Sequence, residues 1–285
     1  MATEHDNPYD LLADTSDGGH RWAFGTGFYD PLEGIDTSVP AAVDADALAA
    51  YCLGLGDDAL IYSHRLQQWL TRMPELEEET ALANIALDLL GQARMLLSRA
   101  GGILGRGEDE LAFHRIEAEF RNVRLVERLD ADFAELVGRL LIFSAWRLDL
   151  FSKLTSFADP VLAAIAAKGV KELTYHRDWA ASWVVRLGDG TEYSSDRMAA
   201  ALRVIWPLAD ELFRPGPSGF PLASREAVDH VLDAVFAAAK LERPVVAPLA
   251  AVGGRAGREG LHTEALGYVL AELQSIARAY PGATW

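Results

Sequence analysis

The residues of this chain that could hold metal ions are carboxylates and histidines at helical spacing. Glu172 and His176 are four residues apart, so on a helix they lie on one face. Asp88 and Gln92 have the same spacing nearer the N-terminus. Carboxylates that bridge two hard cations, with histidines beside them, are typical of the metal pairs held in four-helix bundles. The first chemistry to consider is therefore that of a di-iron or di-manganese centre.

The ligand set for such a centre is incomplete in this sequence. A working set needs one Glu from each of two helices and a Glu-x-x-His from each of the other two. The segment with Asp88 and Gln92 has no histidine, and Glu172 and His176 are spaced by four instead of three. We therefore predict no metal, catalytic or cofactor-binding residue in this chain. Asp88, Gln92, Glu172 and His176 are expected to form a buried hydrogen-bonded network instead. The remaining acids on the expected helices are Asp57, Asp58, Asp130, Asp132, Glu135 and Asp149.

The one Glu-x-x-His in the sequence runs from Glu259 to His262, beside several glycines. Such a glycine-rich segment predicts a loop, where a helical ligand pair would not form. Two further pairs at i, i+4 are isolated, and we interpret them as surface or capping contacts. These pairs are Glu110 with His114 and Glu226 with His230.

The elements that carry these residues are predicted to be helices. Apolar residues recur in steps of three and four, for example from Leu48 through Leu55 and Leu66, which indicates one buried helical face. Gly54 and Gly56 predict close packing or a bend in the first helix. The four long helices are expected at about 44–72, 75–100, 132–155 and 159–187.

Local signals set the expected ends of the helices. Gly101 and Gly102 are expected to stop the second helix, and Asp159 with Pro160 should begin the fourth. Three shorter helices are then predicted: one capped by Ser194 or Ser195 and reaching Phe213, one from Ser224 to about Leu241, and one from about Thr263 to Tyr280.

Two long helical pairs joined by a longer connection, at about 103–130, are typical of the ferritin-like layout. The predicted fold is therefore all-α, a ferritin-like four-helix bundle with additional C-terminal helices. It should span residues 43–285. Residues 1–42 are rich in Gly, Asp, Ser and Pro, and we predict a flexible N-terminal tail there.

Composition narrows the partners and the compartment. The formal net charge of −16 disfavours nucleic acid and anionic membranes as partners. A single cysteine, Cys52, excludes a disulfide framework within the chain and fits a reducing cytosol. No secretory signal is recognisable in the polar, acidic first ten residues, so a cytoplasmic location is expected.

Several longer stretches resemble one known family. They are LGLGDDAL at 53–60, SHRL at 63–66, ALANIALDLLGQAR at 81–94, DELAF at 109–113, KELTYH at 171–176 and GLHTEALG at 260–267, with the Pro281-Gly and Trp285 ending. Together they resemble the structural, non-catalytic component of bacterial phenylacetyl-CoA epoxidases, which belongs to the ferritin-like superfamily. The resemblance covers about residues 45–285, and the first 42 residues depart from the family pattern.

The resemblance implies a role without catalysis in this chain. The family pairs with a homologous catalytic subunit that holds a di-iron centre, and the complex epoxidises the ring of phenylacetyl-CoA in aerobic phenylacetate degradation. Electrons come from NADPH through a reductase with FAD or FMN and an iron–sulfur cluster. Two alternatives remain open at this point: an active di-iron or di-manganese enzyme built around Glu172 and His176, or a ferritin-like binding protein unrelated to oxygenases.

Overall fold

In the computed structural model, the described part of the chain comprises residues 32, 34–281 and 283. The predicted flexible tail, residues 1–42, lies mostly outside this part, as do residues 282 and 284–285 of the family-like ending. Where the tail segment is described, Ile35 and Val39 pack against the core and the carbonyl of Thr37 accepts a hydrogen bond from Arg99.

All regular secondary structure in the described residues is helical, and one isolated bridge joins Val252 to Arg255. None of the described helices is long and apolar enough to span a membrane. The α-helices are α1 (Ala45–Gln67), α2 (Leu76–Leu104), α3 (Glu108–Phe113), α4 (Phe133–Leu154), α5 (Pro160–Gly188), α6 (Glu192–Ala209), α7 (Arg225–Ala238) and α8 (Glu264–Ala279). Short 3-10 turns lie at Leu70–Arg72 (η2), Glu117–Glu119 (η3), Arg124–Glu127 (η4), Asp210–Phe213 (η5) and Gly257–Glu259 (η6).

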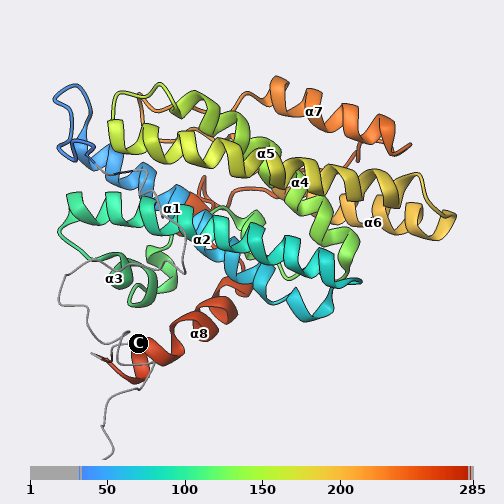
Figure 1. Cartoon of the computed structure of the whole chain (residues 1–285), viewed down its shortest axis with the longest axis horizontal. Coiled ribbons are helices and arrows are strands. Elements are labelled where there is room, and N and C mark those ends of the chain that lie inside the picture. The colour runs from blue at the N-terminus through green and yellow to red at the C-terminus, as the bar shows by residue number, and fades with distance from the viewer. Residues whose placement is uncertain (1–31, 33, 282, 284–285) are drawn as a thin grey trace, which may run out of the picture.

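Four long helices form the central bundle, which confirms the predicted ferritin-like layout. α1 packs along α2, α4 packs along α5, and α2 also contacts α5. The connection between the two pairs contains α3, η3 and η4. Figure 1 shows α7 on the outer side of the α4–α5 pair and α8 on the opposite side of the molecule, below α1 and α2. Apolar side chains from all four long helices fill the centre, as the three-and-four spacing predicts.

Side-chain caps explain where several helices begin. Asp132 accepts a hydrogen bond from the backbone N–H of Glu135 at 2.9 Å and so begins α4. Asp159 accepts a hydrogen bond from the backbone N–H of Leu162 at 2.8 Å and so begins α5. Pro160 occupies the first turn of this helix, as predicted. Ser224 begins α7, also as predicted.

Three predicted helix ends are wrong. α1 ends at Gln67, before the predicted Arg72, which lies in the separate η2 turn. α2 does not stop at Gly101 and Gly102 but continues to Leu104 and ends at Gly105, whose φ of 68° is left-handed. Gly101 is required for another reason, because a Cβ atom there would lie 2.2 Å from the carbonyl oxygen of Arg106. α7 ends at Ala238, three residues before the predicted Leu241, and Lys240 follows with a φ of 57°.

The predicted bounds of α6 are also wrong. Its cap is Thr191, not Ser194 or Ser195. Ser194 is the third residue of the helix, and it exchanges hydrogen bonds with Thr191. The α-helix ends at Ala209, after Pro207, and the chain reaches Phe213 through the tighter η5 turn. The close packing predicted at Gly56 is confirmed, because a Cβ atom there would lie 2.9 Å from Cδ2 of Leu97 on α2.

Candidate functional site

A chain of polar contacts crosses the middle of the bundle and involves all four long helices. Arg147 of α4 is fully buried, and its Nε donates to Oε1 of Gln92 on α2 at 3.0 Å. Its Nη2 donates to the carbonyl oxygen of Leu55 on α1 at 3.2 Å. Gln92 in turn donates through Nε2 to Oε2 of Glu172 on α5 at 2.9 Å. The Gln92 amide therefore joins a buried cation to a carboxylate near the rim of the bundle.

Arg147 remains charged in this position. Burial lowers its pKa to about 10, and the negative charge of Asp58 counteracts this effect. The guanidinium carbon lies 4.4 Å from the ring centroid of Phe151, which favours a cation. Its Nη1 has no hydrogen-bond partner among the described residues. At neutral pH the centre of the bundle thus contains a fixed positive charge.

The predicted partners Asp88 and His176 form a separate contact. His176 is fully buried, and its Nε2 lies 3.0 Å from Oδ2 of Asp88 across the α2–α5 boundary. The Asp88 side chain is 36 % exposed, whereas that of Glu172 is 14 % exposed and also pairs with Lys168 at 2.7 Å. The four predicted network residues are therefore paired, with Gln92 and His176 inside and the two carboxylates toward the surface.

The residues at the bundle centre do not fit a di-iron site. A guanidinium group has no lone pair to offer a metal, and its charge repels cations. The neighbouring Gln92 is a neutral amide that already bonds to Arg147 and Glu172. In the part of the chain that the structure describes, no group of three or more His, Cys, Asp or Glu side chains could hold a metal ion.

Sequence reasoning missed Arg147, although a signal for it was present. Arg147 interrupts the apolar stretch from Leu136 to Phe151. A charge inside such a stretch indicates a buried charged group as readily as a surface one, and Arg139 in the same stretch is buried as well. Arg139 forms an ion pair with Asp130, which is also buried.

The acids of the first helix, Asp57 and Asp58, are buried but have partners outside the four-helix bundle. Asp57 forms an ion pair with Arg115 and accepts the backbone N–H of Arg121 at 2.8 Å. Asp58 forms a two-pronged pair with Arg258, at 2.6 Å and 3.0 Å. Both carboxylates therefore attach the covering segments to α1, and neither is available as a metal ligand.

The Glu259–His262 segment is a loop feature, as predicted, but the side chain of its histidine is buried. His262 Nδ1 lies 2.7 Å from Oε1 of Glu127, and Nε2 lies 3.0 Å from the carbonyl oxygen of Phe120. Because both ring nitrogens face acceptors, the doubly protonated imidazolium satisfies both contacts. Burial opposes this charge, yet the hydrogen bond and charge of Glu127 raise the pKa of His262.

The two isolated pairs are surface features, in agreement with their interpretation. His114 and His230 are both exposed, and Glu110 pairs with Arg106 instead of its histidine. Because all four side chains are exposed, neither pair contributes to the bundle centre.

The sequence of this chain is similar to proteins of one known family. Residues 34–285 match the family described as "Phenylacetic acid catabolic protein". A related protein, one of the subunits of the 1,2-phenylacetyl-CoA epoxidase of Escherichia coli (strain K12), is 42 % identical over 245 residues. That alignment covers 84 % of this chain and 99 % of the relative. The chain therefore belongs to the phenylacetic acid catabolic protein family.

Proposed function

We propose that this chain is the structural subunit of a phenylacetyl-CoA ring-epoxidising oxygenase and that it pairs with a homologous di-iron catalytic subunit. The observation that carries the proposal is the buried Arg147, joined to Gln92 at the point where all four long helices meet. A relative whose name makes it a subunit of such an epoxidase supports the assignment. The chain has the bundle of a metal enzyme, with a cation where ligands would be needed.

The contribution of such a subunit is mechanical. Its packed helices would hold the helices of the partner in the geometry that binds the di-iron centre and the acyl-CoA. The oxygen chemistry belongs to the partner, and electrons reach it from NADPH through a reductase with a flavin and an iron–sulfur cluster. No residue of this chain needs to touch the reacting atoms.

Helix α2 offers a surface for this pairing. Leu76 is 73 % exposed and Leu87 is 59 % exposed, whereas Ala93 on the same helix is fully buried. α2 thus packs into the core of this chain on one side and exposes these two leucines on another. Interfaces between permanent partners are apolar and resemble a core cut in half.

Reconstitution with this chain omitted tests the proposal. The catalytic subunit and reductase should epoxidise phenylacetyl-CoA with NADPH and oxygen at a high rate only when this chain is added. Addition of the chain should also produce a stable complex in size-exclusion chromatography. Full epoxidation without the chain, or its failure to associate with the catalytic subunit, would show that the proposed role is wrong.

A further inference from the structure

A cavity of about 290 Å³ lies beside the bundle, on a side of α1 and α4 that the segments after η5 and around η6 cover. Its lining includes exposed residues, such as Ala50 and Gly216, and buried ones, such as Trp146 and Leu150, which are each 3 % exposed. The cavity therefore runs from the surface to a buried floor. Small-molecule sites in proteins begin at about 300 Å³, so the space suits a compact ligand.

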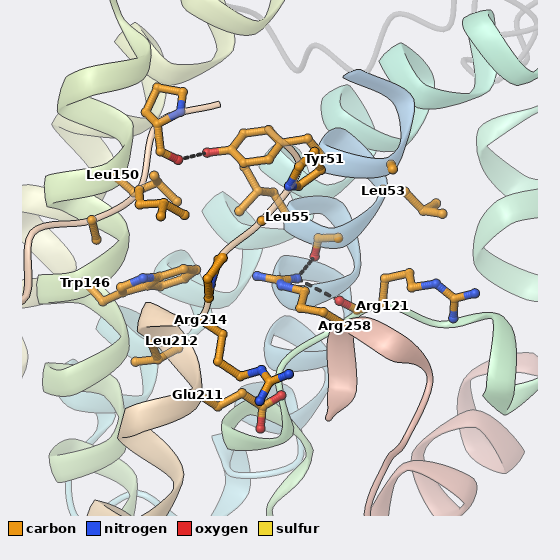
Figure 2. A pocket seen from close by; sticks show the side chains of 18 of the residues that line it. Tyr51, Leu53, Leu55, Arg121, Trp146, Leu150, Glu211, Leu212, Arg214 and Arg258 are labelled. Atoms are coloured by element: carbon orange, nitrogen blue, oxygen red, sulfur yellow. Dashed lines mark hydrogen bonds between the residues drawn. The ribbon is translucent and has the colours of Figure 1, made fainter. Parts of the chain in front are cut away.

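The buried part of this cavity is apolar. Trp146 and Leu150 of α4 and Leu212 of η5 lie on one side of it, and Tyr51 of α1 lies on the other (Figure 2). Each of these four residues is less than a tenth exposed. Two aromatic rings and two branched side chains favour a ligand whose surface is apolar and partly flat.

The walls are also fixed in position. The Tyr51 hydroxyl donates to the carbonyl oxygen of Pro221 at 2.8 Å, and the Tyr51 ring lies 4.6 Å from that of Phe220, centroid to centroid. Pro215, Pro217 and Pro221 restrict the backbone of the covering segment. Walls held in this way do not close over the space between them, so an unfilled cavity forfeits dispersion contacts that a ligand would restore.

The charged side chains on the lining already have partners within the protein. The pairs are Arg258 with Asp58, Arg124 with Glu211, and Arg214 with Glu259. Arg121, also on the lining, donates to two backbone carbonyl oxygens. A charged ligand would have to displace one of these partners or remain unpaired, and a buried charge without a partner is costly. An uncharged ligand leaves every pair in place.

We propose that this cavity is a binding site for a small uncharged aromatic molecule with one ring. The ring contacts Tyr51 and Trp146 and is held by burial of its apolar surface and by dispersion. Apolar cavities of about 150 Å³ bind benzene, so this larger space accepts a ring with a short apolar substituent. The proposal concerns binding alone and involves no covalent step. It does not rest on the proposed function, because every residue involved belongs to this chain.

The test uses the full chain and 4-fluorotoluene, whose binding is followed by fluorine NMR and by calorimetry. Binding should saturate at one molecule per chain, which distinguishes a cavity from adsorption on exposed apolar surface. 4-Fluorobenzoate has the same ring but carries a carboxylate. It should bind at least about tenfold more weakly, because the cavity offers its charge no free partner.

A blocking variant and a matched control locate the site. A Cβ atom at Gly216 would lie 3.9 Å from Cε2 of Tyr51 and from Cδ2 of Leu222, which is ordinary contact. Gly216→Leu therefore adds bulk beside Tyr51 and should weaken binding at least about tenfold. Gly102→Leu is the control, because Gly102 is exposed, lies outside the lining and has no neighbouring atom within 4 Å of its Cβ position. It should bind as the wild type does.

An enlarging variant tests the fit. Leu150→Ala widens the buried part of the cavity, so it should bind 1-fluoronaphthalene at least about fivefold more tightly than the wild type does. Damage to the fold would not produce such a gain. Circular dichroism and melting curves establish that each variant is folded, and if Leu150→Ala is not, the comparison of Gly216→Leu with Gly102→Leu decides alone. The proposal is overturned if the folded wild type does not bind 4-fluorotoluene, if 4-fluorobenzoate binds as tightly, if Gly216→Leu binds as Gly102→Leu does, or if folded Leu150→Ala shows no gain.

Discussion

Arg147 shows how one side chain can change the chemistry of a bundle. Its guanidinium group donates hydrogen bonds to Oε1 of Gln92 and to the carbonyl oxygen of Leu55, both neutral groups. Burial disfavours any charge in this position, so the fold keeps the cation at a cost that the surrounding contacts offset only in part. The same charge would raise the free energy of any metal ion bound near Glu172 and His176.

Reversing this charge should create affinity for metal. Arg147→Glu replaces the buried cation beside Gln92 with a carboxylate, so Co²⁺ binding, measured by calorimetry and visible spectroscopy, should tighten by at least about tenfold over the wild type. Arg147→Met, which removes the charge without adding a ligand, is the control and should gain less affinity for Co²⁺. Stoichiometric iron in the wild type, lost in Glu172→Ala or His176→Ala, would contradict a metal-free role.

The Asp88–His176 contact predicts a moderate effect on stability. Asp88→Ala leaves both ring nitrogens of the buried His176 without partners, because Nδ1 has none among the described residues. The free energy of unfolding should fall by about 1–3 kcal/mol. Asp88→Asn retains an acceptor oxygen, so its free energy of unfolding should fall less. Urea unfolding measures the stability of both variants, and Asp178→Ala, at an exposed position, serves as the reference. If Asp88→Ala were as stable as the wild type, the contact would contribute nothing to stability.

At the scale of elements, the covering segments are attached to the bundle through buried charged groups. Glu127 at the end of η4 accepts hydrogen bonds from Asn122, from His262 and from the backbone and hydroxyl of Thr263, the cap of α8. One carboxylate thus fixes the loop before α8 and the start of that helix. Arg258 attaches η6 to α1, because its guanidinium group donates hydrogen bonds to Asp58 and to the carbonyl oxygen of Gly54.

This arrangement predicts a specific pH dependence. The pKa of His262 is raised in the folded state, so the stabilisation by its proton is complete below the ordinary pKa of about 6.5 and is lost as the pH rises through the raised value. The stability difference between wild type and His262→Gln should therefore shrink from about pH 6 to about pH 9. Urea unfolding at both pH values checks this, with exposed His114→Gln as control. A difference that stays constant or grows with pH would rule out a protonated His262.

The elements themselves were largely predictable, since their signals are local. The caps Asp132, Asp159 and Ser224 lie within three residues of the backbone groups they bind. The end of α2 was mispredicted because Gly101 is needed for a close approach by Arg106 and not for a left-handed turn. The long-range pairs were harder to foresee: Arg147 and Gln92 are 55 residues apart, and Glu127 and His262 are 135 apart. No local pattern specifies such pairs, because they form only once the helices have packed.

At the scale of the whole molecule, a bundle with an uncovered apolar face should not remain alone. The lone chain is expected to self-associate, because Leu76 and Leu87 on α2 are largely exposed. Leu87→Asp should reduce this self-association and weaken pairing with the catalytic subunit, by about tenfold or more if Leu87 lies near the centre of the interface. Light scattering and size-exclusion chromatography measure both effects.

The matched control is Val245→Asp, which alters a fully exposed apolar residue in the segment after α7. It should pair and behave as the wild type does. If the wild type were monomeric at all concentrations, or if Leu87→Asp left the pairing unchanged, the interface would have to lie on another face.

The pair formed by Asp58 and Arg258 has a consequence for the order in which the chain can fold. Its members are 200 residues apart, and Asp58 is wholly buried in the finished protein. During synthesis the guanidinium group that pairs with Asp58 emerges 200 residues after that carboxylate. Until then, burying this carboxylate is unfavourable, and contacts of such long sequence separation form slowly. A segment synthesised long after α1 therefore completes the packing of that helix.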